Sequence, residues 1–194
     1  MEKDLTRVKI FIDELFARRN QVVLKYHNLH HTESVVARCY EIAAHYNLTN
    51  PELFCLISAA WFHDTGHLFN ELTDHEQAGS DLMAAFLKSC LTSDSLITVI
   101  ADCIMVTKMS SQPVTEIEKI ICDADTYHFG TPEFLITDTR IYEEMESRLS
   151  IHISNKIDKS IRLLESHRFF TSYCQETLNN GKKKNIDYLK SLIK

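Results

Sequence analysis

The residues best suited to chemistry are His63 and Asp64, which directly follow an uncharged apolar run. That run covers residues 53–62 and reads LFCLISAAWF. A helix that is apolar on nearly every side belongs in a protein core. A carboxylate at its end is costly, because both burial and the negative end of the helix oppose its charge. Asp64 therefore needs a charged partner or a bound cation.

Further groups that bind cations occur elsewhere in the chain. His31 and an aspartate of the pair Asp123 and Asp125 each lie at or near the end of an expected helix. Two imidazoles and two carboxylates suit a divalent ion such as Mn, Fe, Co, Ni, Zn or Mg. Four protein ligands on a six-coordinate ion leave about two positions for water and substrate, as a catalytic centre requires.

Helices have to position these residues, because apolar residues recur at helical spacing and no segment alternates as a strand does. The 194 residues include only 4 glycines and 3 prolines, which favours long helices. We expect an all-α fold. Its helices are expected over about residues 3–19, 31–47, 51–62, 73–90, 93–106, 116–130 and 155–178. A further helix is expected to start near 131 and to carry the exposed acidic segment EEMES, and a last one is expected around 188–192.

Several helix ends carry local signals. Asn50 is expected as the N-cap ahead of Pro51, and Thr131 has the same place ahead of Pro132. The segments 73–76 and 115–118 both have the form of a capping box. Asn180 and Gly181 are expected to stop the helix over 155–178, which leaves lysines 182–184 in a solvated turn.

Composition favours one domain that works in the cytoplasm. The net charge of −6 gives no reason to expect nucleic-acid binding, and no apolar stretch reaches membrane-spanning length. Six scattered cysteines without a CxxC pair are typical of reduced core residues in the cytosol. We expect a single domain over residues 1–194, with a metal-site core at about 20–135 and C-terminal helices at about 136–194.

The candidate ligands resemble the H…HD…D signature of the HD-domain superfamily of metal-dependent phosphohydrolases. The phrases YHNLHHTESVV, AAWFHDTGH, DHEQAGSDLM and CDADTYHFGT fall in the order used by that family, over about residues 20–135. The resemblance implies an HD-type helical bundle with one divalent metal ion. The ligands that it implies are His31, His63, Asp64 and Asp125, with Asp123 as the alternative to Asp125.

The same resemblance suggests further roles. Asp64 would orient or deprotonate the attacking water, and His67, three residues later, would contact phosphate or donate a proton. His75 is either a site residue or an exposed residue at a helix start. Lys108 would neutralise a substrate phosphate, or is a solvated lysine at a helix end. His27 would contact substrate or fix the loop before His31.

The chain is most similar to small stand-alone bacterial HD proteins, whose substrates sequence does not fix. The residue three after the HD aspartate is a histidine and not an acid, and no GYP element follows. We therefore expect cleavage of a phosphate mono- or diester of a small, nucleotide-like substrate, with homo-oligomers left open. The alternatives are a metal- or nucleotide-binding sensor without turnover and an HD-type di-iron oxygenase.

Overall fold

A computed structural model gives the fold, and it describes residues 2–19, 22–69 and 73–193. Within these ranges the chain forms helices and no strand, which confirms the predicted all-α class. The α-helices are α1 (Glu2–Arg18), α2 (Leu29–Ala43), α3 (Asn50–Phe62), α4 (His75–Ser89), α5 (Asp94–Met105), α6 (Glu116–Asp125), α7 (Phe134–Leu149), α8 (Lys156–Ser166) and α9 (Ser172–Ser191). Two short 3₁₀ helices, η1 (Thr65–Phe69) and η2 (Tyr127–Gly130), follow α3 and α6.

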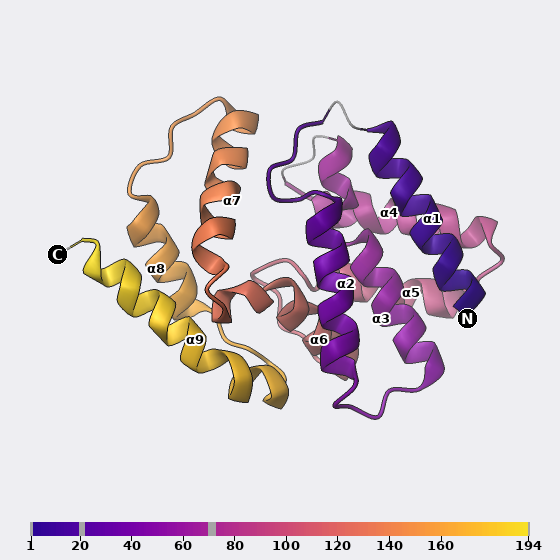
Figure 1. Cartoon of the computed structure of the whole chain (residues 1–194). Coiled ribbons are helices and arrows are strands. Elements are labelled where there is room, and N and C mark those ends of the chain that lie inside the picture. Colours follow the sequence, from indigo (N-terminus) through magenta and orange to yellow (C-terminus); the bar gives the residue numbers. More distant parts are fainter. Residues whose placement is uncertain (1, 20–21, 70–72, 194) are drawn as a thin grey trace.

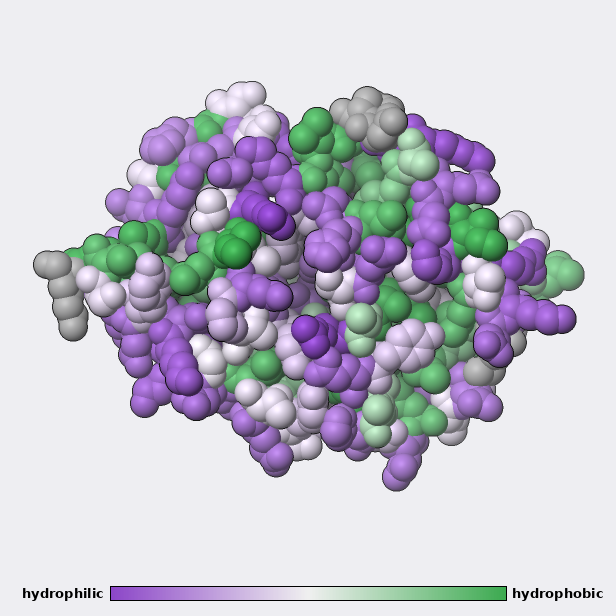
Figure 2. Space-filling view, viewed as in Figure 1, coloured by the Kyte–Doolittle hydropathy of each residue, from purple (hydrophilic) through white to green (hydrophobic). Residues whose placement is uncertain are grey.

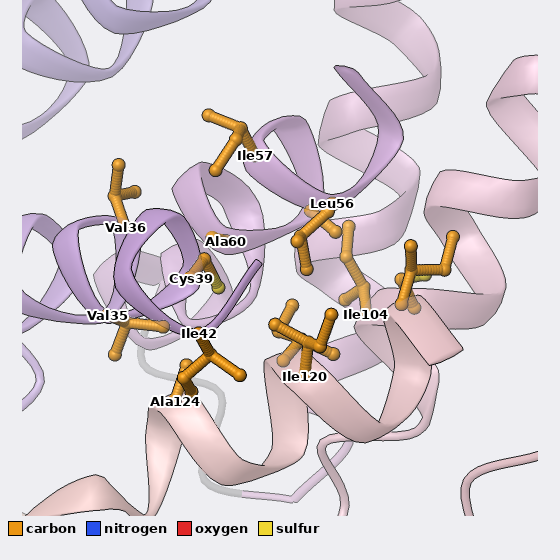
Figure 3. Packing of buried hydrophobic residues seen from close by; sticks show 14 of the residues in the cluster. Val35, Val36, Cys39, Ile42, Leu56, Ile57, Ala60, Ile104, Ile120 and Ala124 are labelled. Atoms are coloured by element: carbon orange, nitrogen blue, oxygen red, sulfur yellow. The ribbon is translucent and has the colours of Figure 1, made fainter. Parts of the chain in front are cut away.

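Helix α3 lies at the centre of the fold, as its apolar sequence predicts. Every residue from Phe54 to Phe62 is buried. It packs against α1, α2, α4, α5 and α6, which surround it on the same side of the molecule (Figure 1). Side chains from α2, α3, α5 and α6 interdigitate between these helices, among them Ile42, Leu56, Ile104 and Ile120 (Figure 3). This packing fixes where α3 ends.

Helices α7, α8 and α9 form a second group beside the first (Figure 1). Helix α9 packs against η2 and α8, and α7 contacts η2. The hydrophobic core nevertheless runs through both groups, from Ile12 in α1 to Leu178 and Leu189 in α9. That residues 1–194 form one domain stays a prediction.

The prediction of one continuous helix over residues 155–178 is wrong. The chain leaves the helix after Ser166 and starts again at Ser172, where Thr171 accepts a hydrogen bond from the backbone NH of Cys174. Gly181 lies inside α9 and does not end it. A Cβ at Gly181 would sit 1.8 Å from the carbonyl oxygen of Gly130, so the glycine permits close contact between α9 and η2. Lysines 182–184 are therefore helical, not part of a turn.

The predicted helix starts agree with the structure in part. The box at Thr115–Glu118 is confirmed, but Thr49, not Asn50, caps α3 and forms a capping box with Glu52. The box expected at 73–76 is wrong, because Asp74 precedes α4 in a left-handed conformation without a side-chain cap. Thr131 lies in extended backbone, and α7 begins only at Phe134.

The cysteines and the surface are unremarkable for a helical protein. All six cysteines are unpaired, and four of them are buried. Polar residues cover most of the face drawn in Figure 2, with apolar residues scattered among them. No helix among the described residues combines the length and apolarity that a membrane span requires.

Candidate metal centre

Three helix ends bring four distant residues together. His31 lies in the first turn of α2, where the side chain of Asn28 accepts a hydrogen bond from its backbone NH and caps the helix. His63 and Asp64 directly follow α3, and Asp125 is the last residue of α6. We call His31, His63, Asp64 and Asp125 the quartet; their ligand atoms all lie within 4.8 Å of one another.

The quartet has the spacing of ligands around a shared ion. Nε2 of His31 lies 3.1 Å from Oδ2 of Asp64 and 3.2 Å from Oδ1 of Asp125. Nε2 of His63 lies 3.2 Å and 3.6 Å from the same two oxygens. Ligand atoms about 2.1 Å from one ion lie roughly 3.0 Å apart at right angles and 3.4 Å apart in a tetrahedron. Three of the four observed distances fall in this range, and the fourth, 3.6 Å between His63 and Asp125, lies just above it.

The quartet atoms that face one another lack hydrogen-bond partners. Nε2 of His31, Nε2 of His63 and Oδ2 of Asp64 are all buried in this state. Nδ1 of His63 lies 2.8 Å from the carbonyl oxygen of Ala60 and donates to it, so Nε2 is the ring nitrogen available to a cation. Buried polar atoms without partners are costly, and a bound cation would satisfy all three at once.

The electrostatics of the quartet point the same way. Burial opposes charge on His31 and His63, but the carboxylates of Asp64 and Asp125 outweigh it and raise the pKa of both histidines. Burial likewise opposes charge on both aspartates, but the histidines outweigh it and lower their pKa values. The two carboxylates therefore hold negative charge that needs positive charge beside it, and a divalent ion would balance it in full.

Comparisons with known proteins agree with this arrangement. The sequence profile of a family described as HD-CE matches residues 4–96, which include His31, His63 and Asp64. A crystal structure of a predicted HD superfamily hydrolase from an uncultured Thermotogales bacterium is similar, with a TM-score of 0.61 at 17% identity, covering 98% of this chain and 90% of that one. The Lin1889 protein from Listeria innocua is similar with a TM-score of 0.60 at 19% identity, over 94% and 96% of the two chains. No curated protein is similar enough to count as a match.

The chain therefore resembles HD-domain proteins in sequence over residues 4–96 and in its overall fold. Asp125 lies outside the segment matched by the family profile, but the structure brings it to the other three quartet residues. Asp123 points elsewhere: its carboxylate accepts hydrogen bonds from the backbone NH groups of Phe170 and Thr171 and from the Thr171 hydroxyl, at 2.6–2.8 Å. Asp123 therefore holds the segment before α9.

A row of three histidines lies beside Asp64. The ring of His67 is tilted by 36° against that of His27 and stacked on that of His75, with centroid distances of 4.0 Å in both pairs. Nε2 of His75 lies 3.7 Å from Oδ1 of Asp64, and His27 and His67 form a second group of potential ligands with the same aspartate. We call His27, His67 and His75 the histidine row. His75 is the first residue of α4, but its side chain is only 21% exposed and lies beside the quartet.

Two residues that the sequence did not single out hold this row. Glu144 accepts hydrogen bonds from Nδ1 of His27 at 2.6 Å and from the backbone NH groups of Tyr26 and His27. Arg148 donates to Nδ1 of His67 at 2.9 Å. The segment EEMES was expected to be exposed, but Glu144 is only 2% exposed. The i, i+4 spacing of Glu144 and Arg148 was the available signal, although it usually marks a surface pair.

Other predicted site residues lie farther out. Lys108 is half-exposed, has Asp74 3.7 Å away, and lines a hollow with Arg168 that contains no quartet residue. His128 lies behind Asp125, and its Nδ1 is 3.3 Å from the hydroxyl of Tyr26. Burial lowers the pKa of His128 to about 4, so this histidine is neutral near pH 7.

The quartet is open to two hollows. One, of about 350 Å³, reaches His31 and Asp125 and has Lys25, Arg38 and Arg140 in its walls. The other, of about 560 Å³, reaches Asp64 and Asp125 together with His27 and His75 of the histidine row, and we call it the side cavity. The side cavity is therefore the one that joins the quartet to the row.

Proposed function

We propose that this chain is an HD-domain protein and a metal-dependent phosphohydrolase, which cleaves a phosphate ester of a small molecule with water. The observation that carries the proposal is the set of buried, unpartnered atoms that His31, His63 and Asp64 direct at one another. These residues and Asp125 would hold one divalent ion. Such an ion would acidify a bound water and polarise a phosphoryl oxygen.

Asp64 links the quartet to the histidine row. Its Oδ2 faces His31 and His63, whereas its Oδ1 lies toward Nε2 of His75. Burial opposes its charge, but His63 and the other nearby histidines lower its pKa, so it stays ionised and can accept a hydrogen bond from the attacking water. This supports Asp64 as both ligand and water-orienting base.

The proton on His67 can be placed from its contact with Arg148. A guanidinium only donates hydrogen bonds, so Nδ1 of His67 has to be the acceptor. Burial lowers the pKa of His67 to about 3, so the ring is neutral and its one proton lies on Nε2. That Nε2 is buried without a partner. His67 is thus prepared to donate a hydrogen bond to a phosphoryl or leaving-group oxygen.

The same contact supports a centre with a single ion. His67 belongs to the second group of potential ligands, but its Nδ1 accepts from Arg148 and its Nε2 carries the proton. Neither nitrogen is then free to bind a cation. A second ion at this group is therefore disfavoured, as is the alternative of a di-iron oxygenase.

The hydrogen bond with Glu144 fixes which nitrogen of His27 is left for other partners. Glu144 is ionised, because its hydrogen bonds with His27 and the backbone outweigh its burial and lower its pKa to about 2. A carboxylate only accepts, so Nδ1 of His27 carries a proton. Nε2 is then the ring nitrogen of His27 that is left for a water or a substrate group, and His27 lines the side cavity. That Lys108 contacts the substrate stays a prediction.

The proposal is tested by measuring phosphate release from simple esters with Mn, Co, Ni, Fe, Zn and Mg in turn. Turnover should require a metal and fall at least about a hundredfold in Asp64→Asn. Asp187→Asn, at an exposed position of α9, is the matched control and should be fully active. Metal binding without release of phosphate from any ester would contradict the proposal and favour the sensor alternative.

A further inference from the structure

The walls of the side cavity show what kind of molecule it fits. At its inner end lie Asp64, Asp125, His27 and His75. Beyond them, η2, α7, α8 and the loop between α7 and α8 contribute a mainly apolar wall that includes Phe129, Phe134, Ile141, Met145, Ile153 and Leu163. Phe129, Phe134 and Ile153 are buried. A volume of about 560 Å³ is in the range of pockets that enclose a small organic ligand.

The rim of the side cavity is apolar as well. Met109, Met145 and Ile151 line it and are 57%, 37% and 51% exposed. These side chains come from three separate segments of the chain, yet they gather at one opening. An apolar group that entered here would stay in contact with apolar surface from the rim to the quartet.

Polar side chains in the far wall already have partners within the protein. The hydroxyl of Thr107 donates to the carbonyl of Ile104, and that of Tyr142 donates to the carbonyl of Lys156. The carboxylate of Asp138 accepts from the hydroxyl of Ser160. Of these groups Asp138 keeps free acceptor positions, so a sugar with several hydroxyls would find few open partners along this wall, and unpaired hydroxyls weaken binding.

Cations are scarce in the side cavity. Among its described lining residues, Lys159 is the one lysine or arginine, and it is exposed. The basic side chains lie instead in the other hollow, where Lys25 is paired with Glu143 and Arg38 with Glu41. A chain of several phosphates would therefore lack counter-charge beside Asp64. One phosphoryl group at the quartet is what this charge distribution favours.

We propose that the substrate of this protein is a phosphate ester with a single phosphoryl group and an apolar alkyl or aryl group that occupies the side cavity. This inference rests on the proposed phosphohydrolase function. It replaces the expected nucleotide-like substrate with a more apolar one, because the far wall offers apolar contact and few hydrogen bonds.

The test compares methyl, butyl and octyl phosphate, phenyl phosphate and nucleoside monophosphates as substrates of the metal-loaded protein. We expect kcat/KM to rise with chain length by up to roughly fourfold per methylene, the factor that corresponds to ~0.8 kcal/mol of buried CH₂. Nucleoside monophosphates should be poorer than octyl phosphate. Equal rates for methyl and octyl phosphate, or a preference for nucleotides, would overturn the inference and leave the hydrolase proposal intact.

A matched pair of variants on α7 locates the effect. Ile141→Gln places an amide in the side cavity and should reduce the octyl-to-methyl ratio about tenfold or more. Ile136→Gln makes the same change in the other hollow, at an exposed position, and should keep the ratio. If the two variants had the same octyl-to-methyl ratio, the side cavity would not be the site of the apolar group.

A binding measurement separates this inference from the proposed function. Octylphosphonate and methylphosphonate cannot be hydrolysed as esters, so calorimetry measures their affinity alone. Tighter binding of octylphosphonate, weakened by Ile141→Gln and not by Ile136→Gln, would support the cavity even if no ester were turned over. Failure of the hydrolysis screen together with this binding pattern would refute only the proposed function. Equal affinities would refute the cavity.

Discussion

Nη1 of Arg148 lies 2.9 Å from Nδ1 of His67, although 81 residues separate the two in the sequence. Arg148 comes from α7, in the C-terminal group of helices, whereas His67 follows the central helix α3. The contact ties the second group of helices to the candidate metal centre of the first. It also places the His67 proton on Nε2, which gives the first prediction.

Replacing Arg148 should change which nitrogen of His67 carries the proton more than it changes the fold around that residue. Arg148→Met removes the donor, so the Nδ1–H form of His67 becomes accessible and kcat should fall roughly a hundredfold. Nitrogen-15 NMR of the ring should show Nε2–H in the wild type and a mixture in the variant. Arg148→Lys keeps a hydrogen-bond donor, so it should restore part of kcat and part of the Nε2–H signal. An Nδ1–H ring in the wild type would refute the assignment.

Metal should stabilise the protein through the quartet. An ion that binds only the folded state adds about 2.7 kcal/mol to the free energy of unfolding at a hundred times its Kd. We expect Mn to raise the Tm of the wild type and to have little effect on His31→Gln. His152→Gln changes an 84% exposed side chain and should respond to Mn as the wild type does. An equal rise in His31→Gln would place the ion elsewhere.

Replacing Asp123 should affect stability, whereas replacing Asp125 should affect metal binding. Asp123 accepts three hydrogen bonds at the start of α9, so Asp123→Asn should cost about 2 kcal/mol of stability in chemical denaturation. Metal affinity of the folded variant should remain near that of the wild type. Asp125→Asn should instead lose metal affinity and keep its stability in chemical denaturation. A stable Asp123→Asn that no longer binds metal would show that the wrong aspartate has been assigned to the quartet.

Stability should decline in acid partly because of His167. Burial, aided by the nearby Lys182, lowers the pKa of His167 from 6.5 to about 3. The unfolded chain then binds a proton between these values that the folded chain does not, so stability is full above pH 6.5 and falls progressively toward pH 3. Denaturation curves of His167→Gln across this range should show a smaller decline than the wild type. An identical decline would exclude this histidine as a source.

His31, His63 and Asp64 were predictable because each lies at a helix end that the sequence marks, whereas the choice of Asp125 over Asp123 came from the resemblance to the HD-domain superfamily. The apolar run before His63 fixes α3 in the core, and the box at Thr115 fixes the direction of α6 toward Asp125. Local signals of this kind act within a few residues. They agree with the packing here, and the predicted quartet residues lie together.

What the sequence missed depends on partners far along the chain. Glu144 looks like one acid among several on a surface helix, and only the loop before α2 explains why it is buried. Gly181 looks like a helix stop, yet its place is set by the carbonyl of Gly130 beneath it. In both cases tertiary contacts override what the local residues favour.

The side cavity draws its inner and outer walls from different parts of the chain. Its inner end is formed by residues that belong to the quartet and the histidine row, all before residue 126, whereas most of its far wall comes from residues 129–163. Under the proposed function, substitutions along α7 and α8 would exchange one leaving group for another while the chemistry at the inner end is kept. Relatives that share the four quartet residues would then not need to share a substrate, and redesign of specificity would have a defined set of positions to begin from.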